Sequence, residues 1–113
     1  MLSPMLPRQS AKLVRVHLSE DDRYNGAPLH EAVVKLCQAA GIAGITVFRG
    51  MEGYGASAEI HRGRVLAHDE PIVITIVDSA ENVARLMPEM ERIVDTGMIA
   101  ISEVEMIRIE RGR

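Results

Sequence analysis

The residues best suited to bind a ligand gather in one segment, RGMEGYGASAEIHRGR, which occupies residues 49–64. It contains four of the chain's nine glycines, three arginines, a histidine and a tyrosine. Glycines allow successive backbone N–H groups to face an anion, and guanidinium groups donate charge-assisted hydrogen bonds to negative oxygens. The ring of Tyr54 could stack on a ligand or insert into a partner. These residues predict a loop that orders on a small anion or a target protein. An ordinary solvated hairpin loop is the alternative.

The glycines of this segment do not form a nucleotide-binding or catalytic motif. Gly50, Gly53 and Gly55 have the spacing GxxGxG, whereas a dinucleotide-binding turn needs GxGxxG between a strand and its helix. No GK[ST] sequence follows, which excludes a P-loop, and Ser57 lacks the GxSxG frame of a nucleophile elbow. We therefore expect no catalytic residue and no enzymatic activity.

Metal ligands are present as residue types but not in a metal-binding pattern. His17, His30, His61, His68 and Cys37 show neither CxxC nor HxxxH spacing. His30 falls in the first turn of a predicted helix and is expected to be exposed. His17 falls on a sheet face that we expect to be buried between subunits, and Cys37 belongs to the buried stripe of the helix. The sequence therefore predicts no metal site.

Composition narrows the class of protein further. The chain has 113 residues and a formal net charge of −3, which argues against nucleic acid as a partner because phosphate binding favours a basic surplus. A single cysteine cannot form an internal disulfide, which fits a reducing compartment. No apolar run is long enough to span a membrane, and the first residues lack the apolar stretch of a signal peptide. We expect a cytoplasmic protein that is not embedded in a membrane.

Hydrophobic periodicity predicts two βαβ units joined by a long connection. Period-two alternation marks strands, apolar residues at helical spacing mark helices, and Asn25-Gly26 marks a turn after the first strand. Pro88 lies inside the second helix and predicts a kink or break near residues 85–87. The alternation slips at residues 102–104, which predicts a bulge or bend. The expected elements are strands at 12–19, 44–49, 72–77 and 98–109, a helix at 28–40, and a helix from Asp78 or Ser79 to Gly97.

This element order predicts an α+β fold of the ferredoxin-like type, βαββαβ, with a four-stranded antiparallel sheet and both helices on one face. Right-handed crossovers place the first and third strands at the centre of the sheet. We expect residues 1–10 to form a flexible tail. Residues 11–113 are expected to form a single domain with a long loop at 49–70.

The sheet face without helices should need a cover. Residues 72–77, IVITIV, are apolar on both sides of the strand apart from Thr75. Soluble monomers rarely leave a contiguous apolar patch in water, and another copy of the chain is the simplest cover. The sequence predicts a homo-oligomer that buries about 800 Å² or more on each partner.

Three stretches of the chain resemble a known family: GIAGITVFRGMEGYGASAEIH at 41–61, PIVITIVDSAENV at 71–83 and PLHEAVV at 28–34. They are similar to the uncharacterised PII-like proteins, a family of unknown function placed beside the nitrogen-regulatory PII proteins and the CutA proteins. The resemblance covers nearly all of residues 13–109 and implies a ferredoxin-like subunit that assembles as a trimer. The connection between the second and third strands would correspond to the PII T-loop, which contacts regulated targets. PII proteins also bind nucleotides through a loop containing glycine and lysine after the second helix, whereas the corresponding DTGMIAIS at 95–102 has one glycine and no lysine.

The resemblance implies a regulatory protein that binds a small anionic or nucleotide-like effector at subunit clefts and contacts a target through residues 49–64. Two alternatives share the fold: a CutA-like trimer that binds divalent metal, and an accessory protein of a membrane transporter or channel. The residues of this chain that match the family pattern, and that we expect to contact ligand or target, are Arg49, Gly50, Glu52, Gly53, Tyr54, Gly55, His61 and Arg62.

Overall fold

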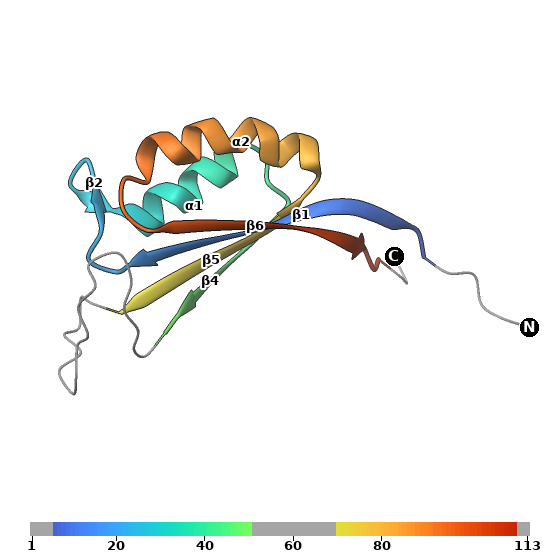
Figure 1. Ribbon diagram of the computed structural model, residues 1–113, viewed down its shortest axis with the longest axis horizontal. Helices are drawn as coiled ribbons and strands as arrows, with labels where there is room; N and C mark the ends of the chain where they lie inside the picture. Colours follow the sequence, from blue (N-terminus) through green and yellow to red (C-terminus); the bar gives the residue numbers. More distant parts are fainter. Residues whose placement is uncertain (1–5, 51–69, 111–113) are drawn as a thin grey trace, which may run out of the picture.

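Four strands form one antiparallel sheet in the order β4-β5-β1-β6, and both helices lie on one of its faces (Figure 1). The computed structural model describes residues 6–50 and 70–110. The first and third predicted strands occupy the two central positions as β1 and β5, which confirms the predicted fold class and strand order. The elements are β1 (Arg8–Ser19), β2 (Arg23–Tyr24), β3 (Ala27–Pro28), α1 (Leu29–Ala39), β4 (Gly44–Arg49), β5 (Pro71–Asp78), α2 (Ala80–Ile93) and β6 (Met98–Ile107).

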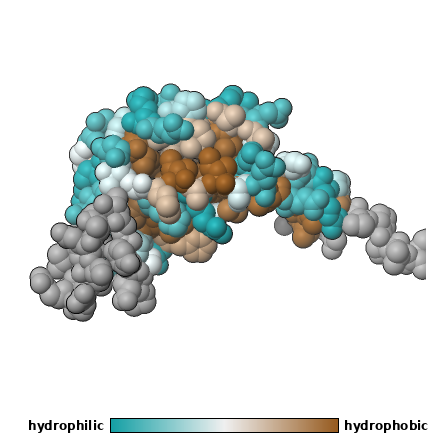
Figure 2. All heavy atoms as spheres, viewed as in Figure 1, coloured by the Kyte–Doolittle hydropathy of each residue, from teal (hydrophilic) through white to brown (hydrophobic). Residues whose placement is uncertain are grey.

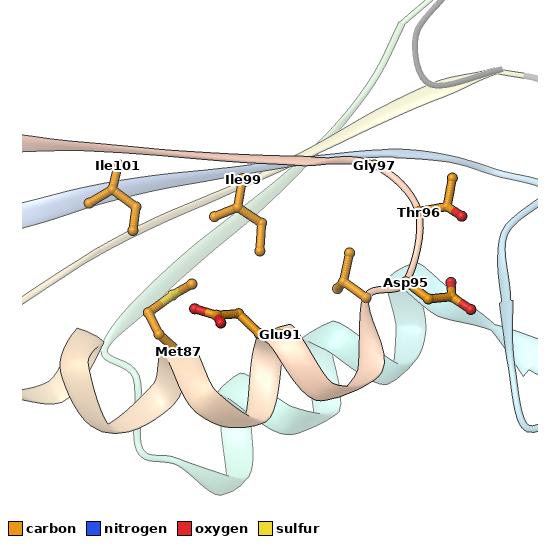
Figure 3. Close-up of a pocket in the computed structure, with 8 residues that line it drawn as sticks. Met87, Glu91, Asp95, Thr96, Gly97, Ile99 and Ile101 are labelled. Atoms are coloured by element: carbon orange, nitrogen blue, oxygen red, sulfur yellow. The ribbon is translucent and has the colours of Figure 1, made fainter.

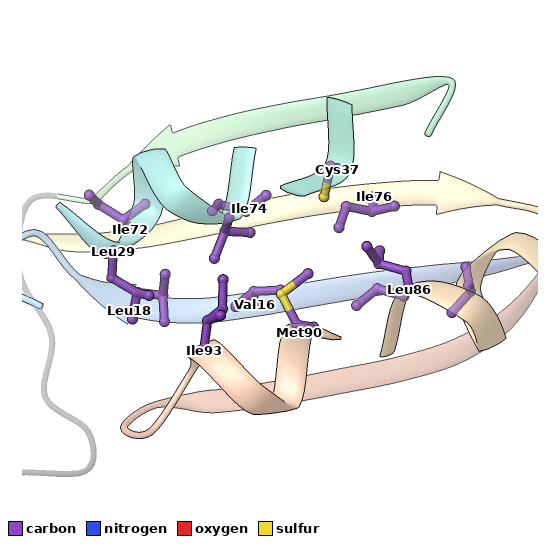
Figure 4. Packing of buried hydrophobic residues seen from close by; sticks show 13 residues of the cluster. Val16, Leu18, Leu29, Cys37, Ile72, Ile74, Ile76, Leu86, Met90 and Ile93 are labelled. Carbon is purple, nitrogen blue, oxygen red and sulfur yellow. The ribbon is translucent and has the colours of Figure 1, made fainter. Parts of the chain in front are cut away.

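The core lies between the sheet and the two helices (Figure 4). Alternate residues of the two central strands face the helices, because side chains along a strand point to opposite faces. Apolar residues at intervals of three or four bring one stripe of each helix onto them. Full burial of each large aliphatic side chain stabilises the fold by roughly 1.5–3 kcal/mol. The cluster consists of Val14, Val16, Leu18, Ile72, Ile74 and Ile76 from the sheet, with Leu29, Val33, Cys37, Val83, Leu86, Met90 and Ile93 from the helices.

A two-residue turn joins β2 to β3 directly before α1. Asn25 and Gly26 have φ angles of 53° and 82°, the positive values that a type I′ hairpin turn requires. Asparagine and glycine tolerate this conformation better than other residues. Beyond the hairpin, the backbone N–H of Leu29 donates to the carbonyl oxygen of Asp22 at 2.8 Å, which fixes the start of α1.

The carboxylate of Asp78 fastens the turn before β4 to the start of α2. Its oxygens accept hydrogen bonds from the backbone N–H of Ala43 at 3.0 Å, the backbone N–H of Ser79 at 2.7 Å and the side-chain amide of Asn82 at 2.8 Å. Ser79 is the N-cap of the helix, since its Oγ accepts from the backbone N–H of Asn82 at 3.1 Å. Burial alone would raise the pKa of Asp78. The three hydrogen bonds, together with the charge of Arg108, outweigh it and hold the pKa below its usual value.

The expected break in α2 and the expected bulge in β6 are both absent. Pro88 does not break α2, which runs as one helix from Ala80 to Ile93, because packing of Leu86 and Met90 against the sheet outweighs one missing backbone hydrogen bond. The last strand has no bulge at residues 102–104. The register of β1 and β6 is unbroken from His17 opposite Met98 to Arg8 opposite Ile107, so the polar residues there face solvent within a regular ladder.

The start of β1 and the end of β6 extend beyond the rest of the sheet. Residues 8–11 pair only with residues 104–107, and we call this two-stranded ribbon the arm (Figure 1). Because β1 begins at Arg8, residues 8–10 of the expected tail belong to a strand; residues 1–5 lie outside the described part of the chain. Arg8 and Glu105 form an ion pair across the arm, with Nε and Oε1 3.7 Å apart.

Candidate functional site

The residues that flank 51–69 meet at one end of the sheet, where β4 ends and β5 begins. The backbone N–H of Gly50 donates to the carbonyl oxygen of Pro71 at 2.8 Å. A Cβ at Gly50 would lie 2.8 Å from Cγ of Pro71, so a side chain there would force the two ends apart. The backbone N–H of Glu20 donates to the carbonyl oxygen of Glu70, also at 2.8 Å. These bonds hold the entry and the exit of the segment together beside the end of β1.

Arg49 is the charged centre of this junction. Its Nη1 lies 2.6 Å from Oε1 of Glu20 and 3.8 Å from Oε1 of Glu70, and its side chain is half exposed. The Arg49 guanidinium beside Glu20 holds the pKa of that carboxyl below its usual range. We refer to Glu20, Arg49 and Glu70 as the junction triad. With two carboxylates and one guanidinium, the triad carries a net charge of −1 when all three groups are ionised.

His30 packs at the same end of the sheet and is buried, contrary to our expectation of an exposed residue. Only 9% of its surface is accessible, and its Nδ1 has no hydrogen-bond partner within the part of the chain that the structure describes. Its charge would be close enough to lower the pKa of Glu20. The prediction from helix position alone was wrong because α1 packs against the β2–β3 hairpin that precedes it.

Of the predicted site residues, the structure places only Arg49 and Gly50, and it brings them together at the junction. Glu52, Gly53, Tyr54, Gly55, His61 and Arg62 lie outside the described residues. The sequence reasoning missed Glu20 and Glu70. A signal was available: Glu20 directly follows one central strand and Glu70 directly precedes the other, so antiparallel pairing of these strands brings the two carboxylates to the same edge.

A groove lies between α2 and β6 on the helix side of the sheet (Figure 3). Its volume is about 340 Å³. Among the described residues that line it, Glu91 and Asp95 are the only charged ones. Gly97 closes one end with a φ of 132°, which favours glycine. The loop that would correspond to the PII nucleotide loop therefore borders a negatively charged surface. The groove is lined by Met87, Glu91, Val94, Asp95, Thr96, Gly97, Ile99 and Ile101.

The sheet face opposite the helices carries exposed apolar side chains, as expected. The strand register places Phe48, Val73, His17 and Met98 in one row across this face. Phe48 and Met98, at the two ends of the row, are each 56% exposed in the single chain. The uncovered face therefore exposes a large apolar side chain on each of its two edge strands.

Two further properties of the described residues bear on the alternatives. Within residues 6–50 and 70–110, no three His, Cys, Asp or Glu side chains lie close enough together to hold a metal ion. Neither helix of this part of the chain is long and apolar enough to cross a membrane.

Comparison with known proteins identifies the family. A model of the DUF190 family, described as an uncharacterised conserved group (Uncharacterized ACR, COG1993), matches residues 11–106. The chain belongs to this family. A UPF0166 protein of Aquifex aeolicus (strain VF5) is 33% identical over 98 residues, covering 85% of this chain and 92% of the relative. A UPF0166 protein of Methanocaldococcus jannaschii is 30% identical over 105 residues, covering 88% and 94%.

Solved structures with the same fold include PII-like proteins, which confirms the resemblance seen in the sequence of this DUF190 member. CPII from Thiomonas intermedia K12, bound to ADP, AMP and acetate, superposes with a TM-score of 0.68 at 17% identity, covering 91% of this chain and 94% of CPII. The GlnK–ATP complex of B. subtilis superposes with a TM-score of 0.54 at 18% identity, covering 84% and 82%. At these identities the likeness shows the fold.

Proposed function

We propose that this DUF190 member is a non-enzymatic, cytoplasmic regulator of the PII-like type. It binds a small anionic or nucleotide-like effector at clefts between the subunits of a homotrimer. It signals to a target protein through residues 49–64. The junction is the observation that carries this proposal. Its hydrogen bonds and the Arg49 ion pairs hold the residues on either side of 51–69 together at one end of the sheet.

The junction supports signalling because it connects the segment to three different strands. A ligand that changes the partner of Arg49 acts on residues beside β1, β4 and β5 at the same time. The structural neighbours indicate which ligands to test: CPII structures contain ADP, AMP and acetate or bicarbonate, and the GlnK structure contains ATP. All of these ligands are anions.

The positive charge for such an anion comes from residues 49–64 in this proposal. In the part of the chain that the structure describes, the α2–β6 groove offers two carboxylates and no arginine or lysine, which disfavours a phosphate there. Arg49, Arg62 and Arg64 are the arginines of the segment, and guanidinium groups bind carboxylate and phosphate oxygens well. Both carboxylates of the junction triad approach Arg49 through Nη1, and an anion that binds the guanidinium competes with them for its charge. In this proposal the anion exchanges with Glu20 or Glu70 as the partner of Arg49. Through this exchange, effector binding would change the contacts of Glu20 at the end of β1.

The uncovered sheet face supports the proposed assembly of several copies. Covering Phe48, Val73 and Met98 with sister chains removes apolar surface from water, and a stable interface needs about 800 Å² on each partner. The faces of neighbouring copies then lie inward, and the junctions lie near the seams between them.

The test is a thermal-stability screen of the purified chain with ADP, AMP, ATP and bicarbonate. An effector at about 100 times its dissociation constant should stabilise the fold by ~2.7 kcal/mol. The Arg62→Ala variant should lose this stabilisation without losing its fold. Lys35→Ala, which removes an exposed cation of α1, is the matched control and should respond as the original chain does. A response that Arg62→Ala retains in full, or no response to any of the four anions, would contradict the proposal.

A further inference from the structure

Side chains that need a cover also occur on the helix side of the sheet, in the α2–β6 groove. Ile99 and Ile101 of β6 form its floor, and Met87 of α2 forms a wall (Figure 3). Ile101 remains 48% exposed in the single chain. Figure 2 shows hydrophobic side chains gathered between α2 and β6, below the hydrophilic outer surface of the helix. The groove is therefore suited to an apolar partner.

The negative charge of the groove indicates which kind of apolar segment would bind there. Glu91 extends into the space between α2 and β6, and Asp95 follows at the end of the helix (Figure 3). Within residues 6–50 and 70–110, no lysine or arginine lines the groove. Two carboxylates beside an apolar floor favour a segment that combines branched aliphatic side chains with arginine or lysine.

The other end of β6 leads into a segment of this composition. Ile107 is 40% exposed and Ile109 is 66% exposed. The end of β6 extends beyond both helices (Figure 1). Residues 107–113 have the sequence IRIERGR, with three arginines and one glutamate. The last residues of the chain and the α2–β6 groove are thus complementary in both hydrophobicity and charge.

The segment cannot reach the groove of its own chain while β6 keeps its register. Eight residues separate Ile101 from Ile109, which corresponds to roughly 26 Å along a strand at ~3.3 Å per residue. β6 stays paired with β1 as far as Ile107 opposite Arg8, so the arm holds this end away from α2. The pairing of β6 with β1 does not prevent the segment from reaching the groove of another copy.

We propose that residues 107–113 of one copy dock in the α2–β6 groove of a neighbouring copy. Ile107 and Ile109 cover Ile101 and Met87 of the neighbour, and the arginines that follow Ile109 face Glu91 and Asp95. The contact is heterologous, with the arm of each subunit reaching the groove of the next, and such contacts close into a ring when the rotation between copies allows it. This inference rests on the proposed homo-oligomer and adds a second contact to the one made by the uncovered sheet face.

Disulfide cross-linking tests the contact directly. Chains carrying Ile109→Cys are mixed with chains carrying Ile101→Cys and oxidised. The expected product is a covalent dimer that contains one chain of each kind. Cys37 can remain, because it is buried and the pKa of its thiol is raised to about 11. Arg85→Cys, exposed on α2 outside the groove, replaces Ile101→Cys in the control mixture and should give no such dimer. Equal yields from the two mixtures would overturn the proposal.

Charge reversal gives a second readout that does not depend on oxidation. The Glu91→Lys/Asp95→Lys variant should dissociate into single copies at a concentration about tenfold or more above that of the original chain, because its lysines repel the arginines of the docked segment. Glu89→Lys on the same helix is the control and should dissociate as the original chain does. Ile109→Asp should act like the groove variant. Ile109 is 66% exposed, so this substitution should leave the fold intact, and circular dichroism of each variant checks this.

Light scattering separates the two proposals. If the original chain has the mass of a single copy, the homo-oligomer itself fails, and the docking contact fails with it. If the oligomer forms but the Glu91→Lys/Asp95→Lys and Ile109→Asp variants dissociate as the original does, only the docking contact fails.

Discussion

Nη1 of Arg49 lies 2.6 Å from Oε1 of Glu20, so the arginine that opens the 49–64 segment is paired with a carboxylate from the end of β1. An anionic effector that uses Arg49 must compete with this carboxylate. The Glu20→Gln substitution should therefore increase the affinity for an anionic effector, because the amide carries no charge to compete. Titration calorimetry of the variant and the original chain measures this difference. Asp21→Asn removes a neighbouring exposed carboxylate and should leave the affinity unchanged; weaker binding by Glu20→Gln would contradict the exchange.

The buried carboxylate of Asp78 should make stability depend on acid pH. Its folded-state pKa is lowered, so its contribution is fully present above the unfolded pKa of about 3.9 and is lost as pH falls through the lower folded value. Asp78→Asn should lose ~1–3 kcal/mol at neutral pH, because the amide cannot accept all three hydrogen bonds. The loss should shrink as the pH is lowered below about 4. Urea unfolding at several pH values measures both effects, and an equal loss at every pH would show that the charge of Asp78 is not responsible.

Gly97 should tolerate no side chain. Its φ is 132°, and an added Cβ would lie 2.5 Å from the carbonyl oxygen of His17 in the neighbouring strand. Gly97→Ala should destabilise the fold by roughly 1–3 kcal/mol through backbone strain and this contact. Gly44→Ala is the control, because no atom lies within 4 Å of its added Cβ and its φ is not positive. Denaturant unfolding of both variants checks the difference, and equal stabilities would contradict it.

The thiol of Cys37 should be chemically silent in the folded protein. The side chain is fully buried in the core, and burial raises its pKa to about 11. Labelling with a thiol reagent should follow global unfolding and accelerate with denaturant. A cysteine placed at the adjacent exposed position, Gln38→Cys, should be labelled without unfolding. Rapid labelling of Cys37 in native buffer would indicate local opening of α1.

Much of the fold could be predicted because the core follows simple periodicities. Val14, Val16 and Leu18 alternate along β1, and Val83, Leu86 and Met90 recur at helical spacing in α2, so the buried faces follow from the order of residue types. The pair Asn25-Gly26 likewise predicts the turn in which it lies, from residue type alone. These signals depend only on neighbours in the sequence.

The predictions that were wrong, and the site residues that were missed, involve contacts between residues far apart in the sequence. His30 is buried by elements on either side of it in the chain, and Pro88 is tolerated because tertiary packing supports α2 around it. The partners of Arg49 are 29 and 21 positions away, at Glu20 and Glu70, and only the pairing of β1, β4 and β5 brings them together. Local patterns carry no information on such pairs until the topology is known.

The proposals for effector binding, signalling and docking all require that copies of this chain assemble through the uncovered sheet face. Light scattering at micromolar concentration tests this requirement most directly, together with a Phe48→Asp/Met98→Asp variant that places charges on that face. The original protein should have a mass three times the 12.4 kDa of the chain. The variant should have the mass of a single copy. A single-copy mass for the original protein, or a full-sized assembly of the variant, would contradict this requirement.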